Sequence, residues 1–336
     1  MSLTTRSAVL TAPQGAVEVR SVDIAAPGPR QVLVRMEACG VCHSDLFVSG
    51  LAKLARTPLT LGHEGVGRIE AVGEECSDWR TGDRVGITFL GSTCGACEYC
   101  RSGRERFCPK QMNTGYTLDG ALAGYALADA AQVVRIPEHL DPAVVAPLCC
   151  AGWTAYGALR EAALSPGNSV AIFGYGGLGQ LALQYALAQG LKAAVSDVSQ
   201  MKLELARTAG AFLTTGGQDS GKTLQKQAGG VDAAVVFTNS IAAMQQAVKS
   251  VKRTGTVVLV GLTMQELTLS VTEIILKGIR IVGSFLGTRA DLEAVIRLAG
   301  EGGIQPAVQK FALEEAPEVL AQLDRGEIAG RAVIAF

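Results

Sequence analysis

The chain has 336 residues, of which 48% are hydrophobic and 18% are charged, and its formal net charge is −1 at pH 7. This composition predicts a globular protein of about two domains and excludes a disordered chain. The near-zero charge leaves no electrostatic footprint for a nucleic acid or an anionic membrane, so a small and nearly neutral substrate fits better.

No secretion or membrane signal is evident. Residues 1–15 lack a continuous apolar segment, and no later stretch approaches the roughly 18 unbroken apolar residues of a membrane span. Nine cysteines would suit a disulfide-rich secreted protein, but four of them lie in one loop. We therefore expect a cytoplasmic protein whose thiolates bind metal.

The first third of the chain predicts short antiparallel strands. Alternating segments at residues 17–19 and 31–36 are separated by a turn-rich segment at 26–29, and the same pattern returns at 66–73 and 82–86. We expect a β-rich, barrel-like domain with its functional residues on loops.

Between these strands a thiolate, a hydroxyl, a carboxylate and an imidazole follow one another: Cys42, Ser44, Asp45 and His63. Zinc held by two thiolates and one imidazole keeps a fourth tetrahedral position open, which is the arrangement of a catalytic site. The second thiolate would come from far along the chain, where Cys149 and Cys150 are the candidates. Alone, His63 would be interpreted as a satisfied core histidine; two cysteine partners make it a predicted ligand.

Four further cysteines share one loop: Cys94, Cys97, Cys100 and Cys108. Thiolates a few residues apart can bend back onto one ion, and four of them complete a tetrahedron, so the loop predicts a closed, structural zinc site. Four unrelated free thiols are the plain alternative, but exposed thiols this dense would be a redox liability. A nucleic-acid zinc ribbon would need a basic patch that the loop lacks.

From about Ser169 strands alternate with helices. An apolar strand at 170–173 runs directly into a glycine-rich turn and a helical segment at 181–189. In this context a GxGxxG sequence is the dinucleotide-binding fingerprint, because its glycines permit a tight turn and let a pyrophosphate approach the helix N-terminus. The turn contains Gly174, Gly176, Gly177 and Gly179.

The next strand, residues 192–196, ends at Asp197, 18 residues past Gly179. An acid at this distance accepts the ribose hydroxyls of NAD and would repel the 2′-phosphate of NADP, and no arginine directly follows it. We therefore expect NAD as the cofactor. Alternatively, Asp197 caps the helix that begins near Gln200, and one carboxylate can do both.

The remaining pattern predicts a parallel, doubly wound sheet followed by a mixed C-terminal segment. Strands are expected at residues 231–237, 256–261, 279–284 and 331–335, and helices at 241–251, 290–298 and 314–323.

Together these residues resemble the zinc-dependent medium-chain alcohol dehydrogenases, and more narrowly the short microbial members that are usually homotetramers. The resemblance covers nearly the whole chain, through the motifs at residues 40–45, 62–65, 94–108, 146–154, 174–179 and 330–331. It implies an α/β fold with a GroES-like zinc-binding domain, residues 1–150 and 287–336, and a Rossmann NAD-binding domain, residues 151–286. The active site would lie in the cleft between them.

The resemblance also selects among the cysteines. It implies two zinc ions per chain, a structural one on the four-cysteine loop and a catalytic one on Cys42, His63 and Cys150. Cys39 and Cys149 are then buried neighbours of the ligands. Glu64 resembles a family glutamate behind the zinc that ligates transiently, although an acid beside a cation can also act through its charge alone.

The family resemblance implies roles for further residues at matching positions. Ser44 would take the alcohol proton and pass it on through the ribose hydroxyls, and Asp45 would fix the tautomer of His63 or merely cap a helix. His43 would contact the cofactor pyrophosphate or lie at the surface without a role. Cofactor contacts are also implied for Thr154, Leu178, Lys202 and Arg331. Lys202 fits nearly as well as an ordinary solvated helix residue.

One position departs from the family pattern. Many relatives carry a histidine three residues after the serine, where this chain has Phe47. The usual terminal proton acceptor is therefore missing, and the proton must leave through water, cofactor hydroxyls or another group such as His43.

The resemblance implies hydride transfer between NAD and primary or secondary alcohols, aldehydes or ketones. Phe89 resembles the aromatic wall of the substrate pocket, with Trp153 nearby, and residues 47–60 lack the tryptophan that narrows the pocket in ethanol-preferring relatives. We therefore expect bulkier alcohols to be accepted. An NADPH-dependent aldehyde reductase and a non-catalytic, zinc-stabilised binding protein are the alternatives. A homotetramer is expected by analogy, with a dimer as the second option.

Overall fold

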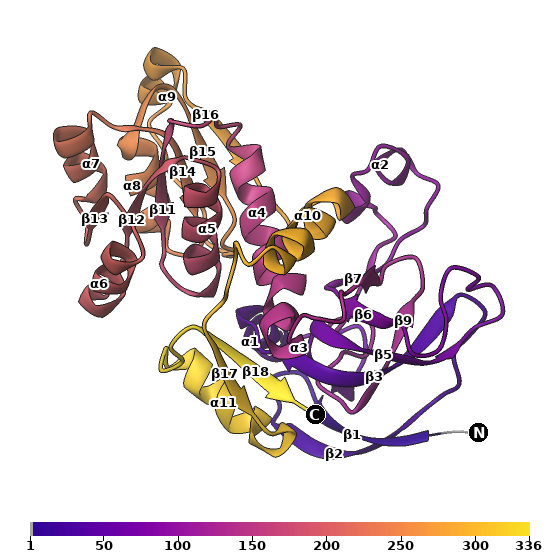
Figure 1. The fold of residues 1–336 in the computed structure, drawn as a ribbon. Helices are drawn as coiled ribbons and strands as arrows, with labels where there is room; N and C mark the ends of the chain where they lie inside the picture. The colour runs from indigo at the N-terminus through magenta and orange to yellow at the C-terminus, as the bar shows by residue number, and fades with distance from the viewer. Residues whose placement is uncertain (1–2) are drawn as a thin grey trace. The chain divides into compact units, whose positions relative to one another are not determined.

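The computed structural model describes residues 3–336, and the chain divides into two compact units (Figure 1). Unit 1 comprises Met1–Ala151 and Thr288–Phe336, and unit 2 comprises Gly152–Gly287. In the described part of the chain no single helix is long and apolar enough to cross a membrane; the helices Pro142–Cys149 and Ala151–Glu161 reach that length only when counted together.

Unit 1 is built on a seven-stranded, mostly antiparallel sheet in the order β10-β6-β5-β3-β18-β17, with β9 also paired to β3. The strands are β3 (Gln31–Gly40), β5 (Glu64–Val72), β6 (Arg84–Ile87), β9 (Tyr125–Asp129), β10 (Val134–Arg135), β17 (Val308–Phe311) and β18 (Arg331–Ala335). The last strand, β18, pairs with β3 at Val333↔Gly40, so the returning C-terminal segment completes this sheet.

Unit 1 also contains smaller elements. A three-stranded sheet contains β2 (Val17–Ile24), β1 (Leu3–Leu10) and β4 (Leu59–Thr60), and a two-stranded sheet contains β7 (Leu90–Ser92) and β8 (Met112–Asn113). The helices are α1 (His43–Ser49), α2 (Glu98–Arg101), α3 (Pro142–Val145), α10 (Arg289–Gly300) and α11 (Ala316–Asp324), with 3-10 turns η1 (Glu105–Phe107), η2 (Ala146–Cys149) and η3 (Leu313–Glu315). The core includes Val34, Leu122 and Ile334.

Unit 2 is a parallel sheet in the order β13-β12-β11-β14-β15-β16. Its strands are β11 (Ser169–Phe173), β12 (Lys192–Ser196), β13 (Leu213–Thr215), β14 (Val231–Val236), β15 (Val251–Leu259) and β16 (Arg280–Gly283). Strand order reverses at β11, from which the chain goes first to β12 and later to β14 on the other side. Ligands bind beyond the carboxyl ends of the strands at such a switch point.

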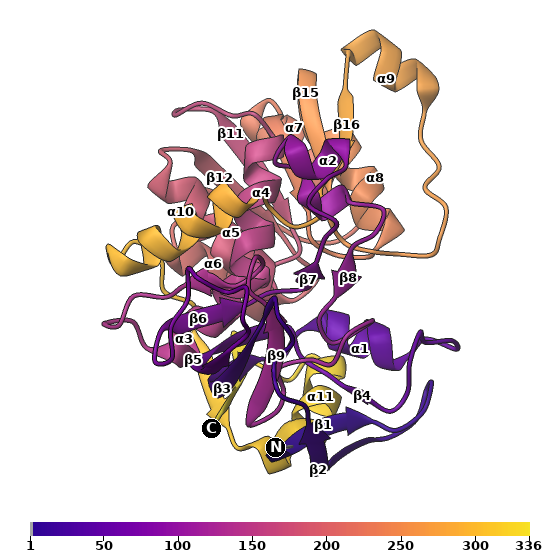
Figure 2. The same ribbon diagram turned by 90° about the vertical axis from the view of Figure 1, so that its right-hand side faces the viewer.

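The helices of unit 2 are α4 (Ala151–Glu161), α5 (Gly177–Ala188), α6 (Gln200–Thr208), α7 (Ser220–Ala228), α8 (Ile241–Ser250) and α9 (Val271–Lys277). Strand β11 is buried along its whole length, as expected for a central parallel strand with helices on both faces. Figure 2 shows α9 at the end of a long connection that follows β15.

The structure confirms the predicted fold class, a β-rich domain joined to a doubly wound parallel sheet. In the part of the chain after Asp197, four short elements were not predicted: β13, α7, α9 and β17. Each has at most nine residues, and α7 is a largely polar helix that ends at the left-handed Gly229 (φ 67°). Such segments show little periodicity, and their structure depends on packing against the sheet.

Candidate active site

Helix α1 positions two of the predicted site residues. Cys42 is its N-cap, and the Cys42 Sγ accepts a hydrogen bond from the Ser44 backbone N at 3.5 Å. Asp45 closes a capping box, since its Oδ2 accepts a hydrogen bond from the Cys42 backbone N at 2.9 Å. The start of this helix therefore fixes the direction of the Cys42 sulfur.

The second Asp45 oxygen supports His63. Asp45 Oδ1 lies 3.2 Å from His63 Nδ1 and accepts a hydrogen bond from the Gly62 backbone N at 3.1 Å. Both expectations for Asp45, helix cap and histidine partner, are therefore met by one fully buried carboxylate. The contact places the proton of His63 on Nδ1 and leaves its Nε2 as an acceptor.

His63 Nε2 is buried and has no hydrogen-bond partner among residues 3–336. An unpartnered buried polar atom is costly, and a metal ion would satisfy it. Ligand atoms of Cys42, His63, Glu64 and Cys150 all lie within 4.8 Å of one another, and all four residues are buried. The pKa of Cys42 is lowered well below its ordinary value, chiefly by a hydrogen bond from Cys150. This donor set suits zinc.

The two neighbouring cysteines lie outside this cluster of described residues. Cys39 Sγ lies 3.5 Å from the Gly40 carbonyl oxygen, and burial raises the Cys39 pKa well above its ordinary value. Cys149 Sγ lies against Gly86, and burial raises its pKa as well. Cys42 and Cys150, whose sulfurs lie in one cluster with His63, therefore fit the metal better.

Glu64 and Arg331 form a buried pair beside the cluster. Arg331 Nη2 lies 2.6 Å from both carboxylate oxygens of Glu64 and donates to the Val41 carbonyl oxygen at 3.3 Å. Burial raises the pKa of Glu64 to about 7, while the Arg331 charge acts in the opposite direction. The predicted contact between Arg331 and a cofactor phosphate stays a prediction.

Sequence reasoning missed this pair. Glu64 and Arg331 are 267 positions apart and meet because β5 and β18 both pair with β3. The spacing of residues along the chain contains no signal for such a contact. Neither residue alone would be expected in a core, since ionised side chains are seldom fully buried without a partner.

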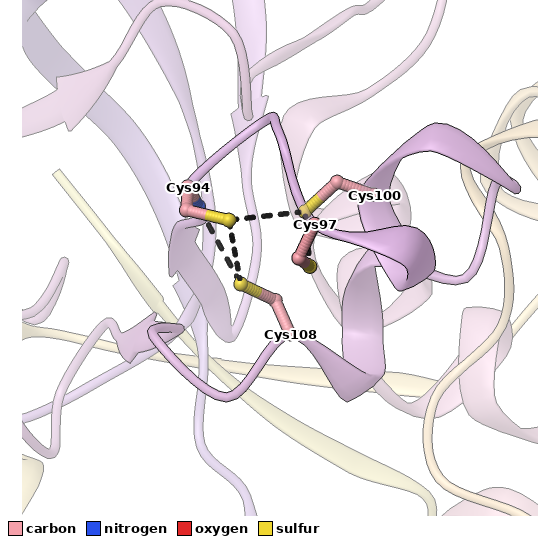
Figure 3. Close-up of side chains that lie close together, drawn as sticks. All are labelled: Cys94, Cys97, Cys100 and Cys108. Carbon is pink, nitrogen blue, oxygen red and sulfur yellow. Dashed lines mark hydrogen bonds between the residues drawn. The ribbon is translucent and has the colours of Figure 1, made fainter.

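The four loop cysteines converge as predicted (Figure 3). The Sγ atoms of Cys94 and Cys108 are 3.5 Å apart, those of Cys97 and Cys100 are 3.5 Å apart, and those of Cys94 and Cys100 are 3.9 Å apart. Four sulfurs about 2.3 Å from one zinc ion would be about 3.8 Å apart, whereas a disulfide bond is about 2.0 Å long. The spacing therefore fits a closed tetrahedral ion.

In unit 2 the glycine-rich turn has the geometry that the fingerprint requires. Gly174 has a φ of +93°, and a Cβ on Gly179 would lie 2.1 Å from the Gly174 carbonyl oxygen. Gly176 is the N-cap of α5 and makes no side-chain cap hydrogen bond, and a Cβ there would meet nothing within 4 Å. The backbone at the start of α5 therefore leaves room for a pyrophosphate, a group that helix N-termini bind through their backbone amides.

Asp197 lies at the end of β12 and closes onto this turn. Its Oδ2 accepts a hydrogen bond from the Tyr175 backbone N at 2.7 Å, and its Oδ1 accepts one from the Ser199 backbone N at 2.9 Å. The alternative interpretation, that Asp197 caps the following helix, is wrong, because the N-cap of α6 is Ser199. The carboxylate is therefore beside the Gly174–Gly179 turn.

The other predicted residues occupy separate positions. Ser44 is half-buried and His43 is exposed at the start of α1, and Phe47 follows one turn later with 43% of its surface exposed. The Phe89 ring packs edge-on against His63, with ring centroids 5.2 Å apart. Buried Thr154 lies on α4, and half-buried Leu178 and Lys202 lie on α5 and α6.

Comparisons with known proteins agree with this geometry. Residues 28–138 match the alcohol dehydrogenase GroES-like domain, and residues 177–301 match the zinc-binding dehydrogenase domain. An alcohol dehydrogenase of Geobacillus stearothermophilus is 42% identical over 333 residues, which cover 98% of both chains.

Solved structures of dehydrogenases are similar to this chain over nearly its whole length. The alcohol dehydrogenase of Aeropyrum pernix is similar with a TM-score of 0.91 at 32% identity, over 98% of this chain and 100% of that one. The structure of CAD from Helicobacter pylori complexed with NADP(H) is also similar, with a TM-score of 0.88 and 26% sequence identity. The match covers 100% of this chain and 99% of that chain. The chain belongs to the family of zinc-dependent medium-chain alcohol dehydrogenases.

Proposed function

We propose that this protein is an NAD-dependent alcohol dehydrogenase whose catalytic zinc is held by Cys42, His63 and Cys150. The buried, unpartnered His63 Nε2 with two cysteine sulfurs close by is the observation that carries the proposal. Bound there, zinc would act as a Lewis acid toward the substrate oxygen, and the nicotinamide would give or take the hydride. A second zinc on the four-cysteine loop would be structural.

The chain's own residues supply orientation and proton transfer. Asp45 holds the His63 ring so that Nε2 points away from its partner. Ser44 would accept the alcohol proton in oxidation while its own hydroxyl proton passes to a ribose hydroxyl of the cofactor, and the transfers run the other way in reduction. The apolar Phe89 ring packs beside His63 and would keep water from that side of the site. Intact Cys42, Ser44, His63 and Cys150 argue against the alternative of a non-catalytic binding protein.

Asp197 is the basis for choosing NAD. Each of its oxygens already accepts one backbone amide, and each keeps a further lone pair for a ribose hydroxyl. A 2′-phosphate would bring a like charge to the same carboxylate. The NADP(H) complex of the Helicobacter pylori relative keeps the NADPH-dependent aldehyde reductase as the second candidate.

A panel of alcohols, aldehydes and ketones, assayed with both cofactors alongside metal analysis, tests the proposal. We expect kcat/KM with NADH to exceed that with NADPH by at least about tenfold, since a like-charge contact of a few kcal/mol is worth that much. Aromatic or longer alcohols should exceed ethanol in kcat/KM. Preference for NADPH would make the protein an NADPH-dependent reductase, and full zinc loading without cofactor binding would favour a non-catalytic role.

The Phe47→His variant tests the proton path. Residue 47 lies one helical turn after Ser44 on α1 and is 43% exposed, so the change should cost little stability. A histidine there must be neutral to accept a proton, so turnover in alcohol oxidation should gain a rise with pH centred near about 6.5. Phe47→Asn, similar in size to histidine but without a titrating group, is the control. An identical pH profile in both variants would show that this position has no part in proton transfer.

Self-association is proposed from the surface of unit 2. Large apolar side chains are exposed on and before α9: Leu262 (65%), Met264 (92%), Val271 (68%), Ile275 (69%) and Leu276 (68%). Strand β16 ends the sheet, and its outer edge has no strand partner in the described chain. These features support a homotetramer, with a dimer as the alternative. The small-molecule substrate remains the expected partner, and the cytoplasmic location stays a prediction.

A further inference from the structure

Thr93, the residue directly before the four-cysteine loop, donates a hydrogen bond from its hydroxyl to the sulfur of Cys100. The Gly95 backbone N donates to the same sulfur. Burial raises the pKa of Cys100, whereas these two donors lower it. Zinc binds the thiolate and not the thiol, so the Thr93 hydroxyl favours the form of Cys100 that the metal needs.

The other donors to the loop sulfurs are backbone amides. The Cys94 backbone N donates to Cys108 Sγ at 3.5 Å, and the backbone N atoms of Ala96 and Cys97 donate to Cys94 Sγ. Four thiolates concentrate negative charge around one ion, and charge-assisted hydrogen bonds stabilise that charge. A backbone amide is present whatever the side chain is, whereas the donor at residue 93 exists because this residue has a hydroxyl.

Gln132 fixes the direction of that hydroxyl. Gln132 Nε2 donates a hydrogen bond to Thr93 Oγ1 at 3.3 Å. An amide nitrogen donates and does not accept, so Thr93 Oγ1 receives this hydrogen on a lone pair and directs its own hydrogen elsewhere, toward Cys100. Gln132 and Cys100 therefore occupy the two sides of one hydroxyl.

The turn that carries Gln132, between β9 and β10, is itself fixed by hydrogen bonds. The Gln132 backbone N donates to the Asp129 carbonyl oxygen at 2.9 Å, and Asp129 Oδ1 accepts from the Ala131 backbone N at 2.9 Å. Arg289, at the start of α10 in the same unit, donates to the carbonyl oxygens on both sides of Gln132, that of Ala131 at 2.7 Å and that of Val133 at 3.1 Å. The Gln132 amide thus starts from a well-anchored backbone.

These contacts form one chain from the turn to the sulfur. We propose that Thr93 and Gln132 are positioning residues for the structural metal: Gln132 orients the Thr93 hydroxyl, and the hydroxyl holds the Cys100 thiolate on the ion and slows its release. This inference rests on the proposed zinc site of the four-cysteine loop. Partners that hydrogen-bond to metal ligands typically change metal affinity about 10–100-fold when they are removed.

Cadmium NMR of the metal-exchanged, full-length protein tests the inference, because a four-sulfur site and a two-sulfur site give separate resonances. Thr93→Val keeps the shape of the side chain and removes the hydroxyl. We expect it to shift the four-sulfur resonance and to leave the two-sulfur resonance of the catalytic site in place. Thr93→Ser keeps the hydroxyl and should keep the wild-type resonance.

The rate of zinc release to a chromogenic chelator gives a second readout. It is measured in a Cys150→Ala background, where the loop zinc alone should remain. Thr93→Val should release this zinc about tenfold or more faster than the Cys150→Ala parent, and Thr93→Ser should stay within about threefold of it. Gln132→Glu should behave like Thr93→Val, because a carboxylate accepts and would draw the Thr93 hydrogen away from Cys100.

Thr5→Val is the matched control. Thr5 lies on β1 in the same unit, is 6% exposed, and its hydroxyl accepts a hydrogen bond from the Tyr125 backbone N at 3.1 Å. The substitution should lower stability and leave both the four-sulfur resonance and the rate of zinc release unchanged. Should Thr93→Val not fold, Thr93→Ala takes its place with the same expectations.

Three results would overturn the inference and leave the zinc site standing. An unshifted four-sulfur resonance with unchanged zinc release in Thr93→Val would show that the hydroxyl does not act on the metal. Fast release from Thr93→Ser would show that the hydroxyl is not the cause, and parent-like release from Gln132→Glu would show that Gln132 does not orient it. If wild type itself gave no four-sulfur resonance, the proposed structural zinc site would be wrong and the inference would fall with it.

Discussion

Replacing Cys150 with alanine is expected to remove one of two zinc ions per chain and to lower kcat/KM about 10³-fold or more. Only Cys42 and His63 would remain of the three proposed ligands, and a Lewis acid contributes several kcal/mol to stabilising the transition state. Metal analysis of the purified variant and steady-state kinetics measure the two effects. The second zinc, on the four-cysteine loop, should stay bound.

The adjacent cysteine is a matched control. Cys149 is fully buried but lies outside the metal cluster, so Cys149→Ala should keep both zinc ions and near-normal kcat/KM. It should lose about 1 kcal/mol or more of stability because a small cavity is created. Loss of zinc from Cys149→Ala together with retention in Cys150→Ala would reverse the ligand assignment.

Replacing Gly176 with alanine is expected to weaken NADH binding about 10–100-fold while leaving the thermal unfolding temperature unchanged. The φ of −87° at Gly176 suits alanine, and the added Cβ meets no atom of the protein within 4 Å. The methyl group would instead occupy space that the pyrophosphate needs to reach the backbone amides of α5. Hydrogen bonds to a charged group are worth about 1.5–3 kcal/mol, which sets the size of the effect.

Fluorescence titration with NADH and thermal unfolding of the same samples check this prediction. Gly303→Ala is the control, because a Cβ there also has room, with its nearest neighbour, the Leu298 carbonyl oxygen, at 3.4 Å, and Gly303 lies in unit 1. Unaltered NADH affinity in Gly176→Ala would place the pyrophosphate elsewhere. A large fall in unfolding temperature would mean that the turn itself had been disrupted.

The features that could be predicted from the sequence are those whose geometry is local. The four loop cysteines lie within a short segment, so a few turns bring their sulfurs together. The GxGxxG turn likewise joins a strand directly to a helix, and each glycine requirement follows from backbone sterics. Asp45 could be expected as a cap because it follows Cys42 by three residues, whereas its contact with His63 was implied by the family resemblance.

Long-range features could not be predicted in this way. Whether Cys149 or Cys150 approaches His63 depends on the break between η2 and α4, where Cys150 adopts φ −133° and ψ −68°. The contact between Glu64 and Arg331 depends on two strands pairing with the same third strand. Short polar helices such as α7 are stabilised by tertiary packing and have little intrinsic signal.

X-ray diffraction at the zinc absorption edge, on crystals of the purified protein, tests the central claim most directly. Two anomalous peaks per chain are expected. One should lie about 2.3 Å from the sulfurs of Cys42 and Cys150 and about 2.1 Å from His63 Nε2, and the other should lie among the four loop cysteines. A chain with no peak at residues 42, 63 and 150, or a peak held by other side chains, would contradict the account.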